Sequence, residues 1–268
     1  MNYLIAALMV AGTMQGKDTS PHSEAQLVAV SSRVQPGGEI LAAVRIKMEP
    51  GWHCYWRNPG DSGMATAIDW KLPAGWKASP LMWPVPHVLD ADGFTVYGFE
   101  DEALFLAKIT APKTAKAGAS YRLGAEANWL ICKDSCVPAK EATSLVVQIG
   151  KPVPSKTWAT RLRVAYEAQP EKAKGWNIAA TLKNKSISLK LGTPPGIKLD
   201  PNVRFIAADP ETIAHSAEQV LEGAGSSYTL RIPESEFASK APTRLRGLLI
   251  GLEGGTAVEI DVPIATSL

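Results

Sequence analysis

The chain has no excess of charge of either sign. Its 268 residues include 28 Lys and Arg against 26 Asp and Glu, which gives a formal net charge of +2. Proteins that bind nucleic acid through its phosphates carry a basic stripe and a high isoelectric point. The balanced charge excludes that class, so we expect no nucleic-acid partner. With 46% hydrophobic and 20% charged residues, the composition is that of a folded globular protein.

Long hydrophobic runs are also absent. No apolar stretch reaches the roughly 18 residues that a membrane-spanning helix needs. The longest covers residues 3–11 and is followed by a polar segment that begins at Gln15. A short apolar stretch at this position is typical of a secretory signal peptide, and we assign residues 1–19 to one. The expected location is therefore outside the cytoplasm.

Cysteine is rare, with three residues at positions 54, 132 and 136. In an exported protein, such a set predicts one disulfide and one free thiol. A metal site needs more ligands than two thiolates, and no further ligands lie near Cys132 and Cys136 in the sequence. We expect neither a metal nor a cofactor, because two sulfurs can carry electrons by themselves.

Proline and glycine, in contrast, are abundant, with 20 and 22 residues spread along the chain. Their spacing favours many short strands joined by turns, and over residues 26–149 it matches an immunoglobulin-like β-sandwich. The predicted strands are 26–32, 39–48, 51–56, 67–71, 103–109, 120–132 and 144–149. Residues 80–98 lack the pattern, and we expect them to form an irregular loop over one end of the sandwich.

A linker and a short helix are predicted next. Two prolines near residue 153 oppose regular structure, and residues 156–169 place Trp158, Leu162 and Ala165 on one helical face. Strands return at 176–182, 186–191, 203–207, 228–232, 244–252 and 257–262. The expected fold class is therefore all-β, with two immunoglobulin-like β-sandwich domains at residues 24–150 and 151–268.

The sharpest local signal is the segment WLICKDSCVP at residues 129–138. In a regular helix, the Cβ atoms of Cys132 and Cys136 would lie about 5–6 Å apart, too far for a disulfide, whereas a hairpin end brings them closer. The bond would close a short loop and stabilise the fold by only about 2 kcal/mol. Because such a disulfide would stabilise the fold so little, a redox role is favoured over a structural one. Lys133 favours a thiolate at Cys132, and Asp134 opposes it.

Cys54 leaves an alternative open. An immunoglobulin-type bridge joins two strands across the core beside a buried Trp, and Cys54, Trp70 and Cys132 occur in that order. Against this bridge, strand alternation places His53 and Tyr55 on one side and Cys54 on the other. Cys54 would then be a small buried hydrophobic residue.

Three other candidates have simpler interpretations. The string GDSG at residues 60–63 resembles the nucleophile segment of serine proteases, but a nucleophilic serine needs a positioned base and an oxyanion hole. We interpret it as a turn in which Asp61 and Ser62 bond the backbone. His87 is expected to be a surface or packing residue. His215 is expected at the surface, and we expect no chemistry in the second domain.

Four ordered segments together resemble a known family. They are GWHCYWRNPGDSG at 51–63, Trp83-Pro84, Val96-Tyr97-Gly98 and the segment 129–138. They are similar to the N-terminal periplasmic domain of the thiol:disulfide interchange protein DsbD, and more closely to its ScsB-like branch. The resemblance covers roughly residues 26–149, and the second half resembles the additional β-domain of that branch. The membrane electron-transfer domain and the thioredoxin-like domain of the family are not recognisable before Leu268.

The resemblance implies a periplasmic redox module of the Gram-negative type, with protein-disulfide reductase activity. Such a module takes electrons from a membrane-embedded thiol–disulfide donor, here in trans, and passes them to a periplasmic thioredoxin-fold or disulfide isomerase-like protein. By position, Cys132 and Cys136 are the redox pair, and Cys136 forms the mixed disulfides. The supporting or shielding residues are His53, Tyr55, Trp129 and Lys133 beside the pair, and Val96, Tyr97 and Gly98 on a cap loop. DsbD has Phe-Tyr-Gly at the cap, and this chain has Val96 in place of the Phe.

Two other functions remain open from the sequence. The domains could form a non-catalytic binding or scaffold protein with a structural disulfide. A copper-tolerance accessory protein would instead hold Cu(I) between reduced Cys132 and Cys136.

Overall fold

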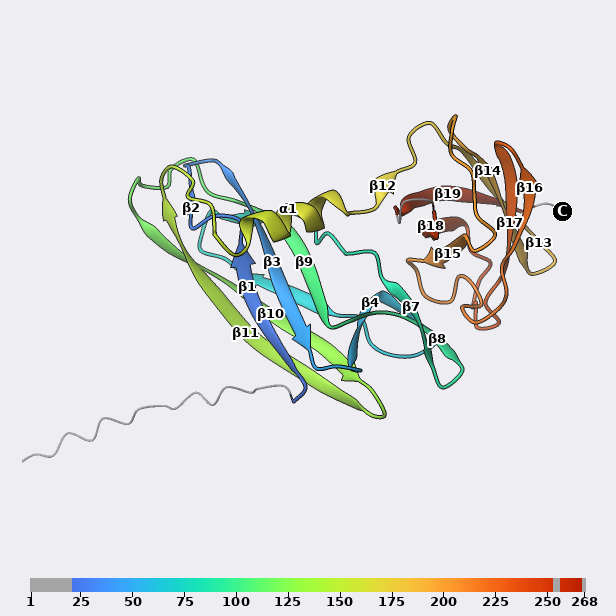
Figure 1. Ribbon diagram of the computed structural model, residues 1–268, viewed down its shortest axis with the longest axis horizontal. Helices are drawn as coiled ribbons and strands as arrows, with labels where there is room; N and C mark the ends of the chain where they lie inside the picture. The colour runs from blue at the N-terminus through green and yellow to red at the C-terminus, as the bar shows by residue number, and fades with distance from the viewer. Residues whose placement is uncertain (1–20, 253–255, 267–268) are drawn as a thin grey trace, which may run out of the picture.

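The computed structural model describes residues 21–252 and 256–266. The predicted signal peptide, residues 1–19, lies outside the described residues. Within the described ranges the chain forms nineteen β-strands and one α-helix, which confirms the all-β fold class (Figure 1). No helix in this part of the chain is long and apolar enough to cross a membrane.

The N-terminal half forms a sandwich of two sheets, which we call the N-terminal domain. In the four-stranded sheet, the order is β1 (Ser23–Ala29), β3 (Glu39–Met48), β9 (Glu102–Thr110) and β6 (Lys77–Ala78). In the seven-stranded sheet, it is β2 (Arg33–Val34), β11 (Cys136–Ile149), β10 (Ser120–Cys132), β4 (His53–Gly60), β8 (Phe94–Glu100) and β7 (His87–Ala91), with β5 (Ala67–Lys71) beside β10.

The core of this domain lies between the two sheets. Alternate residues of β3 point inward, and Ile40, Val44 and Ile46 are at most 2% exposed. They belong to one buried cluster with the large side chains of Trp56 and Trp129. The period-two pattern of apolar residues that predicts a strand thus also determines which face of β3 is buried.

The helix α1 (Ala159–Glu167) lies against the four-stranded sheet (Figure 1). Leu162 is fully buried in a small cluster with Leu106, and Trp158 and Ala165 pack against that cluster. These are the three residues that the sequence places on one helical face. Arg161 of the helix also forms an ion pair with Glu102 of β9. The helix therefore holds the start of the interdomain connection on the N-terminal domain.

The C-terminal half forms one curled, eight-stranded sheet, which we call the C-terminal domain. Its order is β15 (Arg204–Ala207), β18 (Arg244–Ile250), β19 (Val258–Thr266), β13 (Asn177–Lys183), β14 (Ser186–Gly192), β17 (Ser227–Pro233) and β16 (Val220–Ala224), and β12 (Glu171–Lys172) pairs with β19. Leu189, Phe205, Leu230 and Leu249 form the centre of a separate core and are fully buried.

The expectation of an irregular loop over residues 80–98 is wrong in its second half. The segment contains the antiparallel hairpin of β7 and β8, which extends the sheet next to β4. Ala91 pairs with Phe94 around Asp92 and Gly93, whose φ angles are 54° and 87°. Asp-Gly is a strong signal for a two-residue hairpin turn with positive φ at both positions. The proline-rich start of the segment concealed this signal.

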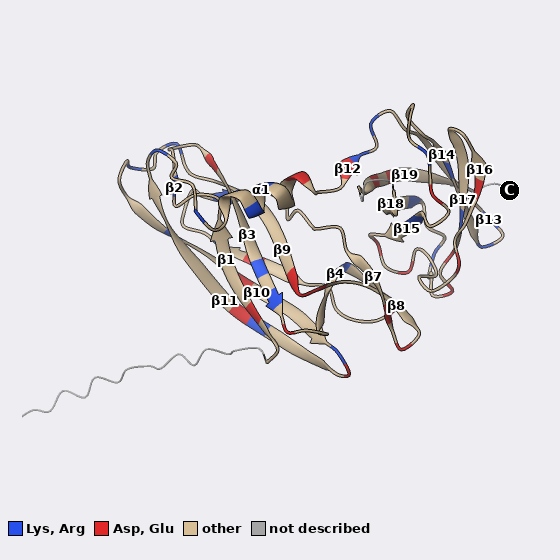
Figure 2. Cartoon of the chain, viewed as in Figure 1, with Lys and Arg blue, Asp and Glu red and all other residues tan. Residues whose placement is uncertain are grey.

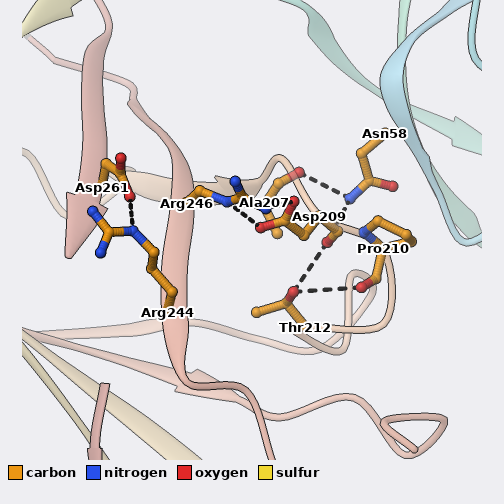
Figure 3. Close-up of polar contacts among 8 residues, drawn as sticks. All are labelled: Asn58, Ala207, Asp209, Pro210, Thr212, Arg244, Arg246 and Asp261. Atoms are coloured by element: carbon orange, nitrogen blue, oxygen red, sulfur yellow. Dashed lines mark hydrogen bonds and ion pairs between the residues drawn. The ribbon is translucent and has the colours of Figure 1, made fainter. Parts of the chain in front are cut away.

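The two domains share buried contacts. Ile206 and Leu248 of the C-terminal domain belong to the same buried cluster as Trp56 and Tyr97 of the N-terminal domain. The amide of Asn58, whose residue is 1% exposed, donates hydrogen bonds to the carbonyl oxygens of Ala207 at 2.9 Å and Asp209 at 3.2 Å (Figure 3). Apolar burial and a satisfied buried amide both favour a fixed arrangement of the domains.

The loop that receives Asn58 is itself held in place. The Arg246 guanidinium makes two hydrogen bonds of 2.8 Å to the carboxylate of Asp209. The Thr212 hydroxyl donates to the carbonyl oxygen of Asp209 at 3.1 Å. Figure 3 shows Arg246 and Thr212 in contact with the same loop that Asn58 contacts. These contacts fix the loop whose carbonyl groups face Asn58.

His215 lies at this interface, so the expectation that it is a surface residue is wrong. The residue is 6% exposed, and its Nδ1 lies 3.1 Å from the hydroxyl of Tyr97 in β8. The two rings meet edge to face at 5.3 Å. No periodic pattern surrounds His215 in the sequence, and the surface that buries it comes from the other domain. Its burial is therefore visible only in the tertiary structure.

This contact predicts an acid-sensitive interface. Burial lowers the pKa of His215 below its usual value of 6.5, while Asp61 opposes the shift. The unfolded chain therefore binds a proton at a higher pH than the folded chain, and stability falls as the pH drops below about 6.5. We expect His215→Gln to weaken this pH dependence of the melting temperature. The substitution should also lower the free energy of unfolding by about 1–3 kcal/mol at neutral pH when the buried Tyr97 hydroxyl loses its partner.

Thermal unfolding from pH 5 to pH 8 measures both effects. The matched control is His87→Gln, because His87 is exposed and lies outside the interface. If the melting temperatures of the wild type and of His215→Gln change with pH in parallel, the prediction is wrong.

Candidate functional site

The two cysteines of the segment 129–138 lie at the end of the longest hairpin. β10 and β11 pair antiparallel from Ser120 to Cys132, and Cys132 is directly opposite Cys136. Their Cα atoms are 4.2 Å apart, and the two sulfurs form a disulfide. The three intervening residues make the turn, in which the Lys133 N–H donates to the carbonyl oxygen of Ser135 at 3.2 Å. This is the hairpin-end geometry that allows a disulfide at such a short separation.

The two sulfur-bearing residues differ sharply in exposure. Cys132 is 2% exposed and packs against Tyr55 and Val96. Cys136, on the other strand, is exposed to solvent. A reacting sulfur must approach along the axis of the disulfide, so access decides which sulfur is attacked. The exposed Cys136 is therefore the sulfur that another protein can reach.

His53 and Tyr55 of β4 flank the disulfide. His53 pairs with Cys132 across the sheet, and its Nε2 lies 3.2 Å from the Tyr55 hydroxyl. The Tyr55 hydroxyl lies 4.0 Å from Sγ of Cys136, within range of a weak hydrogen bond to sulfur. Burial lowers the pKa of His53, and the nearby Glu100 carboxylate opposes this shift. Burial also raises the pKa of Tyr55, so its hydroxyl stays protonated and can donate to the sulfur.

The GDSG segment is a turn and not a protease site. The Asp61 carboxylate accepts hydrogen bonds from the Thr95 N–H at 2.9 Å and from the hydroxyl of Ser216. Ser62 is exposed and has no hydrogen bond to a histidine among the described residues. Gly63 has a φ of 111°, and a Cβ at this position would overlap the Tyr55 ring. Gly63 therefore lets the turn lie flat on Tyr55, next to the disulfide.

The expected cap residues lie on a regular strand, which corrects the expectation of a cap loop. Val96, Tyr97 and Gly98 all belong to β8. Val96 faces Cys132, but Tyr97 is on the opposite face, where it contacts Trp56 and His215. A Cβ at Gly98 would collide with the carbonyl oxygen of Cys54, so glycine is needed there for close strand packing. Of the three, only Val96 belongs to the buried cluster that contains Cys132.

Trp129 and Lys133, both expected to support the pair, lie in different surroundings. Trp129 is fully buried between the sheets, and its Nε1 donates to the Ser23 hydroxyl at 3.1 Å. Cys132 follows three positions later and faces the other side of β10, because successive side chains alternate. Lys133 is exposed in the turn and lies over Gly51, which has a φ of 81°. Trp129 is therefore a core residue, whereas Lys133 borders the disulfide.

Cys54 is a free thiol on the core face of β4 and is fully buried. This excludes the Cys54–Cys132 bridge in the structure and matches the interpretation of Cys54 as a small hydrophobic residue. Burial raises the pKa of the Cys54 thiol to about 12. The thiol is therefore protonated at neutral pH and is not a nucleophile.

The described ranges contain no group of three or more His, Cys, Asp or Glu side chains that could hold a metal ion.

Residues 20–148 match the family model described as "Thiol:disulfide interchange protein DsbD, N-terminal". The N-terminal domain is a member of the DsbD N-terminal family. The match includes every cysteine of the chain and ends next to the last residue of β11. At the level of the family, this DsbD N-terminal domain is a component of thiol–disulfide interchange.

The whole described fold resembles a solved structure. The N-terminal periplasmic domain of ScsB from Proteus mirabilis superimposes with a TM-score of 0.69 at 18% sequence identity. The alignment covers 94% of this chain and 98% of the ScsB domain, so the likeness extends beyond the DsbD N-terminal domain into the C-terminal domain. At this identity the likeness shows a common fold.

Two other structures align over most of the chain but with low TM-scores. The periplasmic chaperone SfaE gives 0.23 and the titin Ig tandem domains A164-A165 give 0.17, values too low to indicate a common fold. No curated protein matches the sequence.

Proposed function

We propose that this protein is a periplasmic thiol–disulfide interchange module that passes reducing equivalents through Cys132 and Cys136. One observation carries the proposal. A disulfide closes the end of a hairpin in a DsbD N-terminal domain, with Cys132 buried and Cys136 exposed. A bond across so short a loop adds little stability, and its exposed sulfur is open to exchange.

The reaction has two balanced steps. In the reduced protein, the Cys136 thiolate attacks one sulfur of a substrate disulfide, and the other substrate sulfur leaves as a thiolate. The Cys132 thiolate then attacks Sγ of Cys136 and expels the second substrate thiolate. Two electrons have moved to the substrate, and the Cys132–Cys136 disulfide has formed. A dithiol donor reverses the same steps and restores the reduced pair.

Tyr55 and His53 supply the polar side of this chemistry. The Tyr55 hydroxyl lies 4.0 Å from Sγ of Cys136 and can donate a hydrogen bond to a thiolate there. His53 lies 3.2 Å from the same hydroxyl and orients it. Hydrogen bonds to the charged form lower the pKa of an acid, so this pair favours the reactive thiolate of Cys136. Val96 covers Cys132, so a partner protein can approach the disulfide only at Cys136.

The family suggests the partners. Interchange proteins of this kind act with thioredoxin-like proteins, and we propose a membrane-embedded thiol–disulfide donor in trans and a periplasmic thioredoxin-fold acceptor. Both would meet the exposed face of Cys136. The turn residues Lys133, Asp134 and Ser135 are exposed beside it and would form part of the contact.

A redox titration tests the proposal. The protein is equilibrated across a glutathione series, free thiols are alkylated, and each cysteine is mapped by peptide mass spectrometry. We expect Cys132 and Cys136 to titrate together, within the range of about −120 to −270 mV where exchange proteins lie. Cys54 should stay reduced in every sample. A pair that remains oxidised throughout would show a structural disulfide and would overturn the proposal.

A further inference from the structure

A groove of about 760 Å³ lies between the β7–β8 hairpin and the C-terminal domain. Its lining comes from the hairpin tip, from the first residues of the GDSG turn, and from two loops of the C-terminal domain at residues 210–217 and 235–237. The volume is within the range of sites that bind ligands or side chains of a partner. Figure 1 shows the hairpin below the loops of the C-terminal domain.

The groove is acidic. Asp61, Glu211 and Glu236 line it, and no Lys or Arg is among its lining residues. Asp61 accepts hydrogen bonds from the Thr95 N–H of β8 and from the Ser216 hydroxyl of the C-terminal domain, whereas neither Glu211 nor Glu236 forms an ion pair in the described part of the chain. Two further carboxylates, Asp90 and Asp92, are exposed at the hairpin tip. Figure 2 shows acidic positions on the β7–β8 hairpin and on loops of the C-terminal domain. Such a field attracts a positively charged partner.

The groove is also lined by exposed aromatic rings. Phe237 is 82% exposed and Phe94 is 54% exposed, one on each side of the groove. Ile213 lies in its buried wall. Large aromatic side chains left in contact with water beside a concave surface are characteristic of protein interaction sites. The occupant that fits therefore carries apolar side chains together with positive charge.

Two short paths join the groove to the disulfide. Gly60 and Asp61 line the groove, and Gly63 of the same turn lies on the Tyr55 ring, whose hydroxyl is 4.0 Å from Sγ of Cys136. Phe94 also precedes Val96 by two positions in β8, so it is only about 7 Å along the strand from the residue that covers Cys132. A protein bound at Cys136 can therefore reach the groove without a long extension.

We propose that the groove binds a basic, apolar segment of the partner protein whose cysteine reacts at Cys136. The inference rests on the proposed function, because it identifies a docking surface for the same reaction. Apolar side chains of the segment pack between Phe94 and Phe237, and its Lys or Arg residues meet Glu211 and Glu236. Binding of the segment raises the local concentration of the partner disulfide at Cys136.

The test uses three mixed disulfides with 5-thio-2-nitrobenzoate. One is formed by a peptide with a single cysteine followed by alternating Phe, Leu, Lys and Arg, the second by the same peptide with Glu at the basic positions, and the third by glutathione. Each reacts with the reduced full chain, and absorbance reports the thionitrobenzoate released when Cys136 attacks the peptide or glutathione sulfur. We expect the basic peptide to react about tenfold faster than the acidic one, with a smaller difference at high salt.

Substitutions in the groove make the test specific. Glu211→Lys combined with Glu236→Lys should abolish or reverse the preference for the basic peptide. Phe94→Ala combined with Phe237→Ala should slow the basic peptide several-fold, because apolar contact area is lost. All variants should react with the glutathione compound at the wild-type rate. The matched controls are Glu167→Lys and Val146→Ala, which are exposed outside the groove and should change nothing.

The outcomes separate the two proposals. If the glutathione compound fails to oxidise Cys132 and Cys136, the proposed function is wrong. If it reacts but the basic and acidic peptides react equally fast, only the docking groove is wrong. Inhibition by a small aromatic amine without inhibition by a cysteine-free basic peptide would identify a small-molecule site instead. Self-association that the double Phe variant abolishes would assign the groove to a second copy of this chain. Either result would overturn the proposal.

Discussion

Cys136→Ser is expected to abolish disulfide exchange. Cys136 carries the exposed sulfur, and the serine hydroxyl that replaces it does not ionise at neutral pH. We expect the rate with glutathione disulfide, or with a thioredoxin-fold substrate, to fall by roughly three orders of magnitude. The buried Cys132 thiol remains in this variant, but Tyr55 and Val96 cover it. The size of the rate loss therefore measures how much of the first exchange step depends on the Cys136 sulfur.

Cys132→Ser should behave differently. Cys136 can still attack, but nothing resolves the product, so a mixed disulfide between Cys136 and the substrate should accumulate on non-reducing gels. Cys54→Ala is the matched control and should keep the wild-type rate, because the Cys54 thiol is buried and protonated. Accumulation of adducts on Cys132 in the Cys136→Ser variant, at a rate near that of the wild type, would contradict the order of attack.

Trp129→Ala is expected to destabilise the protein by about 3–5 kcal/mol. Trp129 is fully buried between the two sheets of the N-terminal domain, and truncation leaves a cavity there. The Ser23 hydroxyl also loses its contact with the indole N–H. Denaturant unfolding followed by circular dichroism measures the loss. Trp129→Phe keeps most of the buried surface and should cost roughly 1–2 kcal/mol, which provides a folded variant if the alanine protein does not accumulate.

The exchange rate distinguishes a core role for Trp129 from a role at the disulfide. Trp129 faces the core while Cys132 faces the opposite side of β10, so Trp129→Phe should react with glutathione disulfide at the wild-type rate. A large change in that rate with little change in unfolding free energy would place Trp129 in the site and contradict the structure.

Much of the fold can be predicted from local patterns. Alternating apolar residues predict β3 with the correct bounds, and three apolar residues at helical spacing predict the buried face of α1. The hairpin of β7 and β8 is missed because adjacent prolines favour a loop, although Asp92-Gly93 marks its turn. The strand β16 is also missed, because its burial is slight and its apolar pattern is correspondingly weak.

Local patterns also predict some features of the candidate site and miss others. The pairing of Cys132 with Cys136 follows from spacing and from a motif, and both are local properties of the chain. Strand alternation separates Cys54 from His53 and Tyr55 in the same way. The motifs did not predict that Trp129 and Tyr97 face away from the disulfide. A resemblance gives the order of residues but not the face of the sheet on which each side chain lies.

The sequence by itself determined the all-β class and the face of β4 on which Cys54 lies, and it favoured the short-range cysteine pair, because each depends on residues within a few positions of one another. The tertiary structure alone decided that Tyr97 contacts His215, that Asn58 donates hydrogen bonds to the carbonyl groups of Ala207 and Asp209, and that a groove opens between the β7–β8 hairpin and the C-terminal domain. These contacts join residues separated by more than a hundred positions. Their free energy comes from packing two domains together, and no local pattern records how two separately folded surfaces meet.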